Sequence, residues 1–169
     1  KMYNCALLDM EDMLQNGTSI NGVMIEKPHR FLTAMTIATQ IITAVNSSQY
    51  GGCTVTLTHL APFIRSSKEY YEKKYKERKL TKAQITKFVD EDLRKEITDG
   101  VQTFQYQINS MTTTNGQAPF LSVCMYLGET TEYKEELAML IEEVLRQRIQ
   151  GMKNEKGVYI TPAFPKLLY

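Results

Sequence analysis

The chain has 169 residues, of which 43% are hydrophobic and 23% are charged, and its net charge is +1. This composition is that of one folded domain and excludes intrinsic disorder. The balanced charge gives no electrostatic reason to expect a nucleic acid as a partner, and no apolar run is long enough to predict a membrane span.

The first third of the chain predicts strands around one long helix. Residues 3–8 form a short apolar run that predicts a strand containing Cys5. A brief helix at 11–14 follows, and the Asn-Gly pairs within 16–22 predict a hairpin or loop. Residues 28–46 begin with proline and carry apolar residues at helical spacing, so they predict a helix buried on most sides.

The middle third is predicted to be mainly helical. A double glycine at 51–52 ends the first region, and β-branched residues alternate through a predicted strand at 53–57. Residues 66–79 are charged and rich in tyrosine, which is typical of a surface helix. A capping-box pattern predicts a further helix over 81–93, and another helical pattern covers 101–108.

The last third predicts two strands around a helix. Residues 119–127 read as a strand, 131–149 as a helix with one apolar stripe, and the residues from 158 onward as a last strand. Strands that alternate with long helices are typical of an α/β domain. Because the chain starts with Lys1 and stops in the apolar run 167–169, we expect a segment truncated at both ends.

The three cysteines, Cys5, Cys53 and Cys124, are widely spaced. Their spacing fits neither a disulfide framework nor a zinc site, which favours a reducing compartment, the cytoplasm. Cys53 and Cys124 are expected to be packing residues. His59 is expected to be a structural histidine with no partner ligands nearby, so no metal is expected.

Several short strings, in one order along nearly the whole chain, resemble the large catalytic subunit of anaerobic (class III) ribonucleoside-triphosphate reductases. They are Tyr3-Asn4-Cys5-Ala6-Leu7-Leu8-Asp9, Lys27-Pro28 leading into 33–40, Ser48-Gln49-Tyr50-Gly51-Gly52, Thr114-Asn115-Gly116-Gln117-Ala118-Pro119-Phe120, and Phe164-Pro165-Lys166-Leu167. Any one string alone would be weak, and their strength lies in the shared order.

The resemblance implies an α/β fold in which 1–169 is a single segment, the first half of a ten-stranded α/β barrel. It implies that the parent enzyme reduces ribonucleoside triphosphates with a glycyl radical and a thiyl radical. The same resemblance places the thiyl cysteine, the radical glycine, a structural zinc site and an ATP-binding domain outside this segment. No cofactor is therefore expected in the segment, which should be inactive alone.

The same resemblance implies the partners of the parent enzyme. They are a ribonucleoside triphosphate as substrate, ATP and deoxynucleotide effectors, a second copy of the subunit and a radical-SAM activating protein. Two other readings stay open, namely a non-catalytic nucleotide-binding and dimerisation module, and a segment of a different glycyl-radical enzyme.

Cys5 matches the family's first-strand cysteine, which faces the ribose. The resemblance implies that it donates a proton to the departing 2′-hydroxyl, a role that suits a thiol because it can give up and regain a proton near neutral pH. The alternative is a small buried apolar residue, the commonest place of a free cysteine.

Two polar regions are candidates for lining the substrate. They comprise Gln49, Tyr50, Gly51 and Gly52 after the long helix, and Asn109, Asn115 and Gln117 before the strand at 119–127. Paired glycines allow a ligand to approach the backbone, and amides can hydrogen-bond a ribose. The alternatives are a helix cap with a tight turn for the first region and a simple Asn-Gly turn for the second.

A third group is implied to bind the effector at a dimer interface built from two helices of each subunit. Its members are Glu26, His29, Gln40, Lys73 and Lys74. Lysines would neutralise phosphate, while Glu26 and Gln40 would bond base or sugar. Relatives often carry a lysine where this chain has His29. The alternative for Lys73 and Lys74 is an ordinary solvated charge run.

Overall fold

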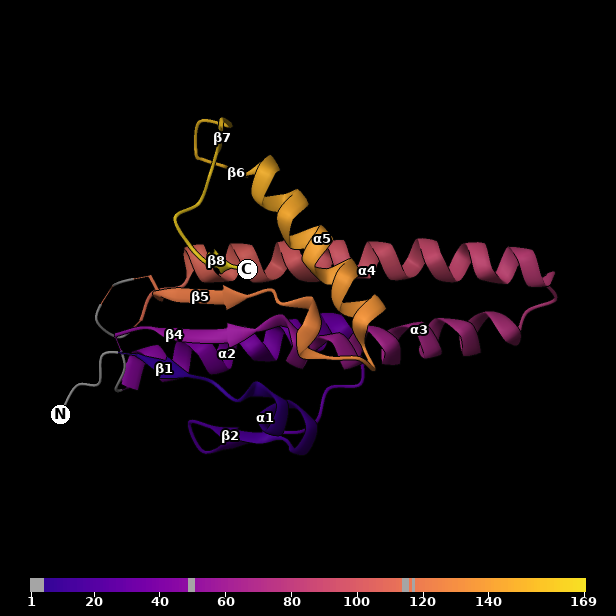
Figure 1. Ribbon diagram of the computed structural model, residues 1–169, viewed down its shortest axis with the longest axis horizontal. Coiled ribbons are helices and arrows are strands. Elements are labelled where there is room, and N and C mark those ends of the chain that lie inside the picture. Colours follow the sequence, from indigo (N-terminus) through magenta and orange to yellow (C-terminus); the bar gives the residue numbers. More distant parts are fainter. Residues whose placement is uncertain (1–4, 49–50, 114–115, 117) are drawn as a thin grey trace.

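The computed structural model describes residues 5–48, 51–113, 116 and 118–169. Its centre is a four-stranded parallel sheet with the strand order β1-β4-β5-β8 (Figure 1). The strands are β1 (Ala6–Leu7), β4 (Cys53–Thr56), β5 (Leu121–Cys124) and β8 (Lys166–Leu168). The predicted α/β class is confirmed.

Helices connect these parallel strands, as parallel pairing requires. They are α2 (Phe31–Ser48) between β1 and β4, α3 (Ala61–Lys76) and α4 (Lys82–Ser110) between β4 and β5, and α5 (Lys134–Gln150) between β5 and β8. None of the helices in the described ranges is long and apolar enough to cross a membrane.

Smaller elements complete the connections. They are α1 (Met10–Asn16), the hairpin of β2 (Thr18–Ile20) and β3 (Val23–Ile25), the 3₁₀ turns η1 (Leu57–Leu60) and η2 (Leu127–Glu129), and the hairpin of β6 (Met152–Lys153) and β7 (Tyr159–Ile160). The predicted last strand is thus two strands, of which only β8 joins the main sheet.

The charged helix begins earlier than predicted, at Ala61, because Pro62 fits a first helical turn. The helices predicted at 81–93 and 101–108 are one helix of 29 residues, α4. The predicted capping box is confirmed, since Gln84 N–H donates to Thr81 Oγ1 and Thr81 N–H donates to Gln84 Oε1 at 2.9 Å.

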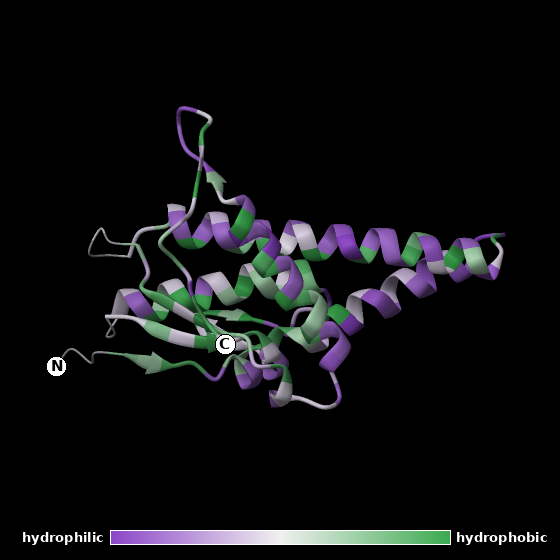
Figure 2. Ribbon diagram, turned by 45° about the horizontal axis from the view of Figure 1, so that its top comes forward, coloured by the Kyte–Doolittle hydropathy of each residue, from purple (hydrophilic) through white to green (hydrophobic). Residues whose placement is uncertain are grey.

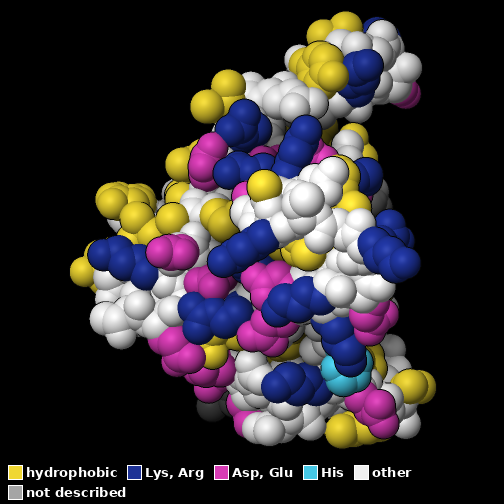
Figure 3. Space-filling view, turned by 90° about the vertical axis from the view of Figure 1, so that its right-hand side faces the viewer, with side chains coloured by type: hydrophobic (Ala, Val, Ile, Leu, Met, Phe, Trp, Pro, Cys, Tyr) yellow, Lys and Arg dark blue, Asp and Glu magenta, His cyan; other side chains and the backbone are white. Residues whose placement is uncertain are grey.

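The helices α3 and the first half of α4 form a two-helix arm that extends beyond the sheet (Figure 1). Seen end-on, basic and acidic side chains are interleaved over this end of the molecule (Figure 3). Apolar residues concentrate in the sheet and on the helix sides that face it, whereas the arm is largely hydrophilic (Figure 2). The arm therefore offers a polar surface and the sheet region holds the core.

A buried carboxylate joins α2, α3 and α4 where the arm leaves the core. Glu96 is only 4% exposed and accepts hydrogen bonds from Arg30 Nη2 at 2.8 Å, Leu32 N–H at 3.2 Å and Ser67 Oγ at 3.1 Å. Ser67 Oγ in turn accepts from Phe31 N–H at 2.9 Å. The junction thereby satisfies the first N–H groups of α2, which have no partner within the helix.

The two longest helices approach closely at Gly100. A Cβ atom at this position would lie 2.6 Å from Cε1 of Phe31, a ring that is fully buried. The absence of a side chain therefore brings α2 against α4, and this packing fixes the helical layer behind the sheet.

The sheet has one face covered by helices and one open face. Side chains alternate along a strand, and partners in a parallel pair point the same way. Cys53, Val55, Leu121 and Val123 are at most 3% exposed and belong to the same core as the helices. The residues between them point to the opposite face, which is open except at Thr56, whose buried hydroxyl donates to Glu129 of η2.

Candidate functional site

Three rows of side chains cross the open face of the sheet. The middle row is given by the strand register, with Leu7 beside Thr54, Thr54 beside Ser122 and Ser122 beside Lys166. The next row, toward the carboxyl ends of the strands, places Thr56 beside Cys124 and Leu168. The preceding row contains the candidate thiol.

Cys5 lies directly before β1, two residues from Leu7, and alternation puts both on the open face. Ala6 pairs with Cys53, so Cys5 lies beside Gly52, and Gly52 lies beside Phe120. Cys5 is exposed and Leu7 is 81% exposed. The alternative of a buried apolar role does not describe Cys5 in this chain.

Phe120 of the neighbouring strand occupies the place that a side chain at Gly52 would need. A Cβ atom at Gly52 would lie 2.9 Å from the carbonyl oxygen and 3.0 Å from Cδ1 of Phe120. The second glycine is therefore required for close packing against Phe120, which lies in the same row as Cys5. Gly51 is exposed at a bend just before it.

The other two cysteines differ in their surroundings. Cys53 is 3% exposed beneath the helices, and Asn46 Nδ2 lies 3.3 Å from its sulfur. Burial raises the pKa of the Cys53 thiol to about 11, so the thiol stays protonated at neutral pH, in keeping with a packing role. Cys124 is half-buried and points to the open face beside Thr56.

Four of the candidate substrate-lining residues, Gln49, Tyr50, Asn115 and Gln117, lie outside the described residues. Near them, Gly116 has a φ of +74° and donates its N–H to the carbonyl of Thr113 at 2.8 Å. A positive φ of this size favours glycine at position 116.

Asn109 does not lie on the open face. It belongs to α4, and its Nδ2 donates to the carbonyl of Gln105 at 2.8 Å and to that of Phe164 at 2.9 Å. The side-chain amide is thus used to hold the segment before β8. The role of Asn109 as a substrate-lining residue stays a prediction.

The effector candidates are mostly accessible. Glu26, His29, Gln40 and Lys73 are exposed, and Lys74 is half-buried. Glu26 and His29 precede α2, Gln40 lies within it, and both lysines lie near the end of α3 in the arm.

One chain does not bring all five together. Thr39, the neighbour of Gln40, hydrogen-bonds Gln107, whereas Tyr75, the neighbour of Lys74, hydrogen-bonds Asp92. Along α4 these two contact points are about 22 Å apart, at 1.5 Å per residue. Gln40 and the two lysines therefore lie on opposite sides of the junction at Glu96.

Lys74 already has a partner within the chain. Its Nζ lies 3.1 Å from Oδ2 of Asp92, which also accepts from Tyr75 Oη at 2.7 Å. The hydrogen bond from Tyr75 and the ammonium of Lys74 hold the pKa of Asp92 below its usual value. Lys73 is exposed, whereas Lys74 is half-buried on α3. Lys73 is therefore the more accessible of the two lysines to a phosphate.

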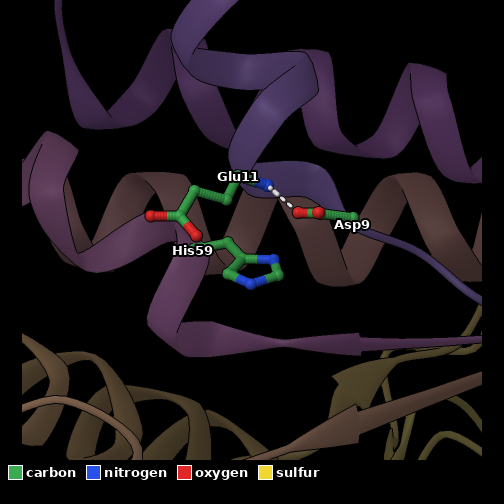
Figure 4. A group of neighbouring side chains, drawn as sticks. All are labelled: Asp9, Glu11 and His59. Carbon is green, nitrogen blue, oxygen red and sulfur yellow. Dashed lines mark hydrogen bonds between the residues drawn. The ribbon is translucent and has the colours of Figure 1, made fainter.

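His59 is less isolated than its sequence surroundings predict. Ligand atoms of Asp9, Glu11 and His59 all lie within 4.8 Å of one another (Figure 4). Asp9 follows β1 and His59 follows β4, so adjacent parallel strands bring them together at one edge of the sheet. The expectation of no neighbouring ligands is therefore wrong for this position.

The two carboxylates of this group have a structural explanation. Asp9 caps α1, since its Oδ1 accepts from Glu11 N–H at 3.2 Å, and Glu11 lies in the first turn of that helix. Acidic residues are favoured at both places. We assign no metal to the group.

Sequence reasoning missed two residues of the open face, Phe120 and Lys166. Lys166 Nζ lies 5.6 Å from the centroid of the Phe120 ring, and the Phe120 and Phe164 rings pack with centroids 4.8 Å apart. Both belong to strings that carry the family resemblance, which was the available signal. Their shared face follows only from the register of β5 with β8.

A parallel sheet with crossover helices on one face, and an exposed thiol on the other, defines an α/β protein whose sheet is part of a barrel wall. A solved structure agrees, the anaerobic ribonucleotide reductase from Thermotoga maritima in complex with dATP and CTP. It matches 87% of this chain and 26% of its own, with a TM-score of 0.59 and 17% identity. At this identity the likeness shows the fold.

Sequence comparisons place the chain more narrowly. The family model for anaerobic ribonucleoside-triphosphate reductase matches residues 1–169. The reductase of that name from Escherichia coli is 34% identical over 171 aligned positions, covering 99% of this chain and 23% of the relative. The reductase of enterobacteria phage T4 is 32% identical, and the alignment covers 98% of this chain and 26% of the relative. The chain belongs to the anaerobic ribonucleoside-triphosphate reductase family and spans about a quarter of the length of these relatives.

Proposed function

We propose that this chain is the first half of the catalytic barrel of an enzyme that reduces ribonucleoside triphosphates to deoxyribonucleoside triphosphates in the cytoplasm. Family membership over all 169 residues supports the reaction, and the parallel sheet supports the place in the barrel. The open face of the sheet is then the interior wall, which the remainder of the enzyme encloses.

The observation that carries the proposal is the position of Cys5. Its thiol is exposed on the open face, in one row with Gly52 and Phe120. A ribose placed against this exposed thiol would bring its 2′-hydroxyl to the sulfur. Cys5 would then donate its proton to the departing hydroxyl, which leaves as water, and would later regain a proton.

The radical groups of the family are proposed to lie in other parts of the enzyme. A glycyl radical, generated with a radical-SAM activating protein, supplies the one-electron oxidation that starts the reaction. In this proposal Cys5 is an acid and is not the radical cysteine. The zinc site is likewise proposed to lie elsewhere in the parent enzyme.

The test is the substitution Cys5→Ser in the full-length enzyme, with Cys53→Ser as a buried-thiol control. We expect Cys5→Ser to reduce product formation by at least about a hundredfold, the usual contribution of a general acid. The glycyl radical signal in electron paramagnetic resonance should persist, because Cys5 takes no part in forming it. Turnover at the wild-type rate would contradict the proposal.

A second proposal concerns regulation. We infer that the arm and the start of α2 form part of a deoxynucleotide effector site at a homodimer interface, as the family resemblance implies. Exposure of Glu26, His29, Gln40 and Lys73 supports this site. Because Gln40 and Lys73 lie on opposite sides of the junction, a complete site needs residues from both copies.

Effector binding can be measured in the full-length enzyme with each deoxynucleoside triphosphate. Lys73→Ala should weaken binding about tenfold, the effect of losing one charge-assisted hydrogen bond. Lys95→Ala is the matched control, since Lys95 is an exposed lysine on α4 paired with Asp99. Equal affinities of the wild type and the Lys73 variant for every effector would remove Lys73 from the site.

The alternative of a non-catalytic nucleotide-binding and dimerisation module is favoured by the same arm. It predicts that the full-length protein binds nucleotides and dimerises but forms no deoxyribonucleotide. A reductase assay therefore separates the two proposals.

A further inference from the structure

Lys166 is the charged residue of the middle row on the open face. The strand register sets it beside Ser122, which is followed by Thr54 and Leu7 across the sheet. The adjacent residue Leu167 points the other way and packs against the helical core. Lys166 therefore shares its face with Cys5.

The side chain of Lys166 leans toward the row of Cys5. Its Nζ lies over the Phe120 ring, 5.6 Å from the centroid. Phe120 lies next to Gly52, and Gly52 lies next to Cys5. Lys166 is on β8, three strand spacings or about 14 Å from β1, and its side chain reaches back across part of that span toward the row of Cys5.

No carboxylate forms an ion pair with Lys166 in the described part of the chain. The ammonium of Lys166 lies over the Phe120 ring instead. Other lysines here do have such partners, for example Lys74 with Asp92. An ammonium enclosed within a barrel needs an anion, because burying an unpaired charge is costly. The missing negative charge is therefore expected from outside the described residues.

Two side chains behind the sheet hold the chain segment that leads into Lys166. Arg148 donates from Nη1 to the carbonyl of Pro162 at 2.7 Å and from Nη2 to that of Pro165, while Asn109 donates to the carbonyl of Phe164 at 2.9 Å. Burial lowers the pKa of Arg148, which indicates that this charge is partly withdrawn from water to hold backbone carbonyls. Such a clamp positions the residue that follows it.

We propose that Lys166 binds the triphosphate of the ribonucleotide whose ribose lies at Cys5. This inference rests on the proposed function, since it requires the open face to hold the substrate. The anion is a phosphate group because Lys166 shares the face of Cys5 within about 14 Å across the strands, a span that the phosphate tail of a nucleotide with its ribose at Cys5 can bridge. The clamp of Arg148 and Asn109 acts through Lys166 and has a positioning role.

The test compares cytidine tri-, di- and monophosphate as ligands of the full-length enzyme. Equilibrium binding is measured with a deoxynucleoside triphosphate in excess, so that the effector site is filled. Variants are Lys166→Met, which removes the charge, and Lys166→Arg, which keeps it. Lys153→Met is the matched control, because Lys153 is also exposed and also contacts a single ring, that of Tyr159 at 5.2 Å.

We expect Lys166→Met to weaken binding of the triphosphate about tenfold or more, and binding of the monophosphate much less. The wild-type preference for more phosphates should shrink in this variant, persist in Lys166→Arg and be unchanged in Lys153→Met. A merely structural role of Lys166 would weaken all three ligands equally.

Two results would overturn the inference while the proposed function stands. One is an equal loss for all three nucleotides, and the other is unchanged affinity in Lys166→Met, as for a solvated lysine on an edge strand. If the wild-type enzyme with its effector site filled binds no ribonucleotide, the proposed function fails first, and this inference fails with it.

Discussion

At the scale of single residues, two of the cysteines differ sharply in their exposure although they lie close together in the fold. Cys5 directly precedes β1 and Cys53 begins the adjacent strand β4, yet one is exposed on the open face and the other is buried under the helices. A thiol reacts as its thiolate, so burial that raises the pKa also makes a cysteine inert.

This contrast predicts different labelling rates. At pH 8 the Cys53 thiol, with a pKa of about 11, is about 0.1% ionised, so an alkylating reagent should modify it far more slowly than Cys5. The rate at Cys53 should rise as the pH approaches the raised pKa, because more thiolate forms. Peptide mass analysis after timed labelling measures both sites, and equal rates at pH 8 would contradict the assigned surroundings.

At the scale of elements, the junction at Glu96 decides how the arm is attached. The carboxylate joins three helices through Arg30, Ser67 and the start of α2. The side chain of Arg30 is 36% exposed, so water screens part of its attraction to Glu96. The rest of the contribution comes from buried hydrogen bonds, which leave unsatisfied groups when they are lost.

Glu96→Ala is therefore expected to lower the free energy of unfolding by about 2–3 kcal/mol, somewhat less than for a fully buried ion pair. Lys95→Ala, one residue away, breaks only an exposed pair with Asp99 and should cost less than about 0.5 kcal/mol. Urea denaturation measures both. Similar losses in the two variants would show that the Glu96 network does not hold the junction.

The elements also show which parts of the fold are readable from sequence. The strands at Cys53–Thr56 and Leu121–Cys124 were predicted because apolar and β-branched residues alternate there. The patterns at 81–93 and 101–108 predict two helices, whereas α4 is one helix that runs through Gly100. That glycine is inside the helix because the Phe31 ring occupies the place of a side chain, which is a tertiary contact.

The same limit applies to the candidate site. Cys5 was found through a short family string, and the alternation of its strand fits the expected face. Lys166 and Phe120 were not assigned a role, because their proximity depends on the register between strands far apart in the sequence. The contact of Asn109 with Phe164 could not be predicted for the same reason, since 55 residues separate the two.

At the scale of the whole molecule, the sheet has two unpaired edges and one uncovered face. In the described chain β1 and β8 are the edge strands, and Leu7, Phe120 and Leu168 are exposed on the open face. Such edges and apolar groups favour pairing with a second sheet.

We therefore expect the isolated 169-residue chain to be inactive and to self-associate. Size-exclusion chromatography with light scattering should give a mass above that of one chain, 19.4 kDa, increasing with concentration. Leu7→Lys would add a second positive charge to the face that carries Lys166, remove an exposed apolar group, and should reduce the association. A monomer with a sharp thermal transition would contradict this expectation.

The account as a whole depends on a sugar meeting the sulfur of Cys5 on the open face of this sheet. The most direct measurement is a crystal structure of the full-length enzyme with a ribonucleoside triphosphate and an effector. We predict that Sγ of Cys5 lies within about 4 Å of the ribose 2′-oxygen, the range for a sulfur hydrogen bond. A ribose bound elsewhere in the enzyme, with Cys5 away from any nucleotide atom, would contradict the central claim.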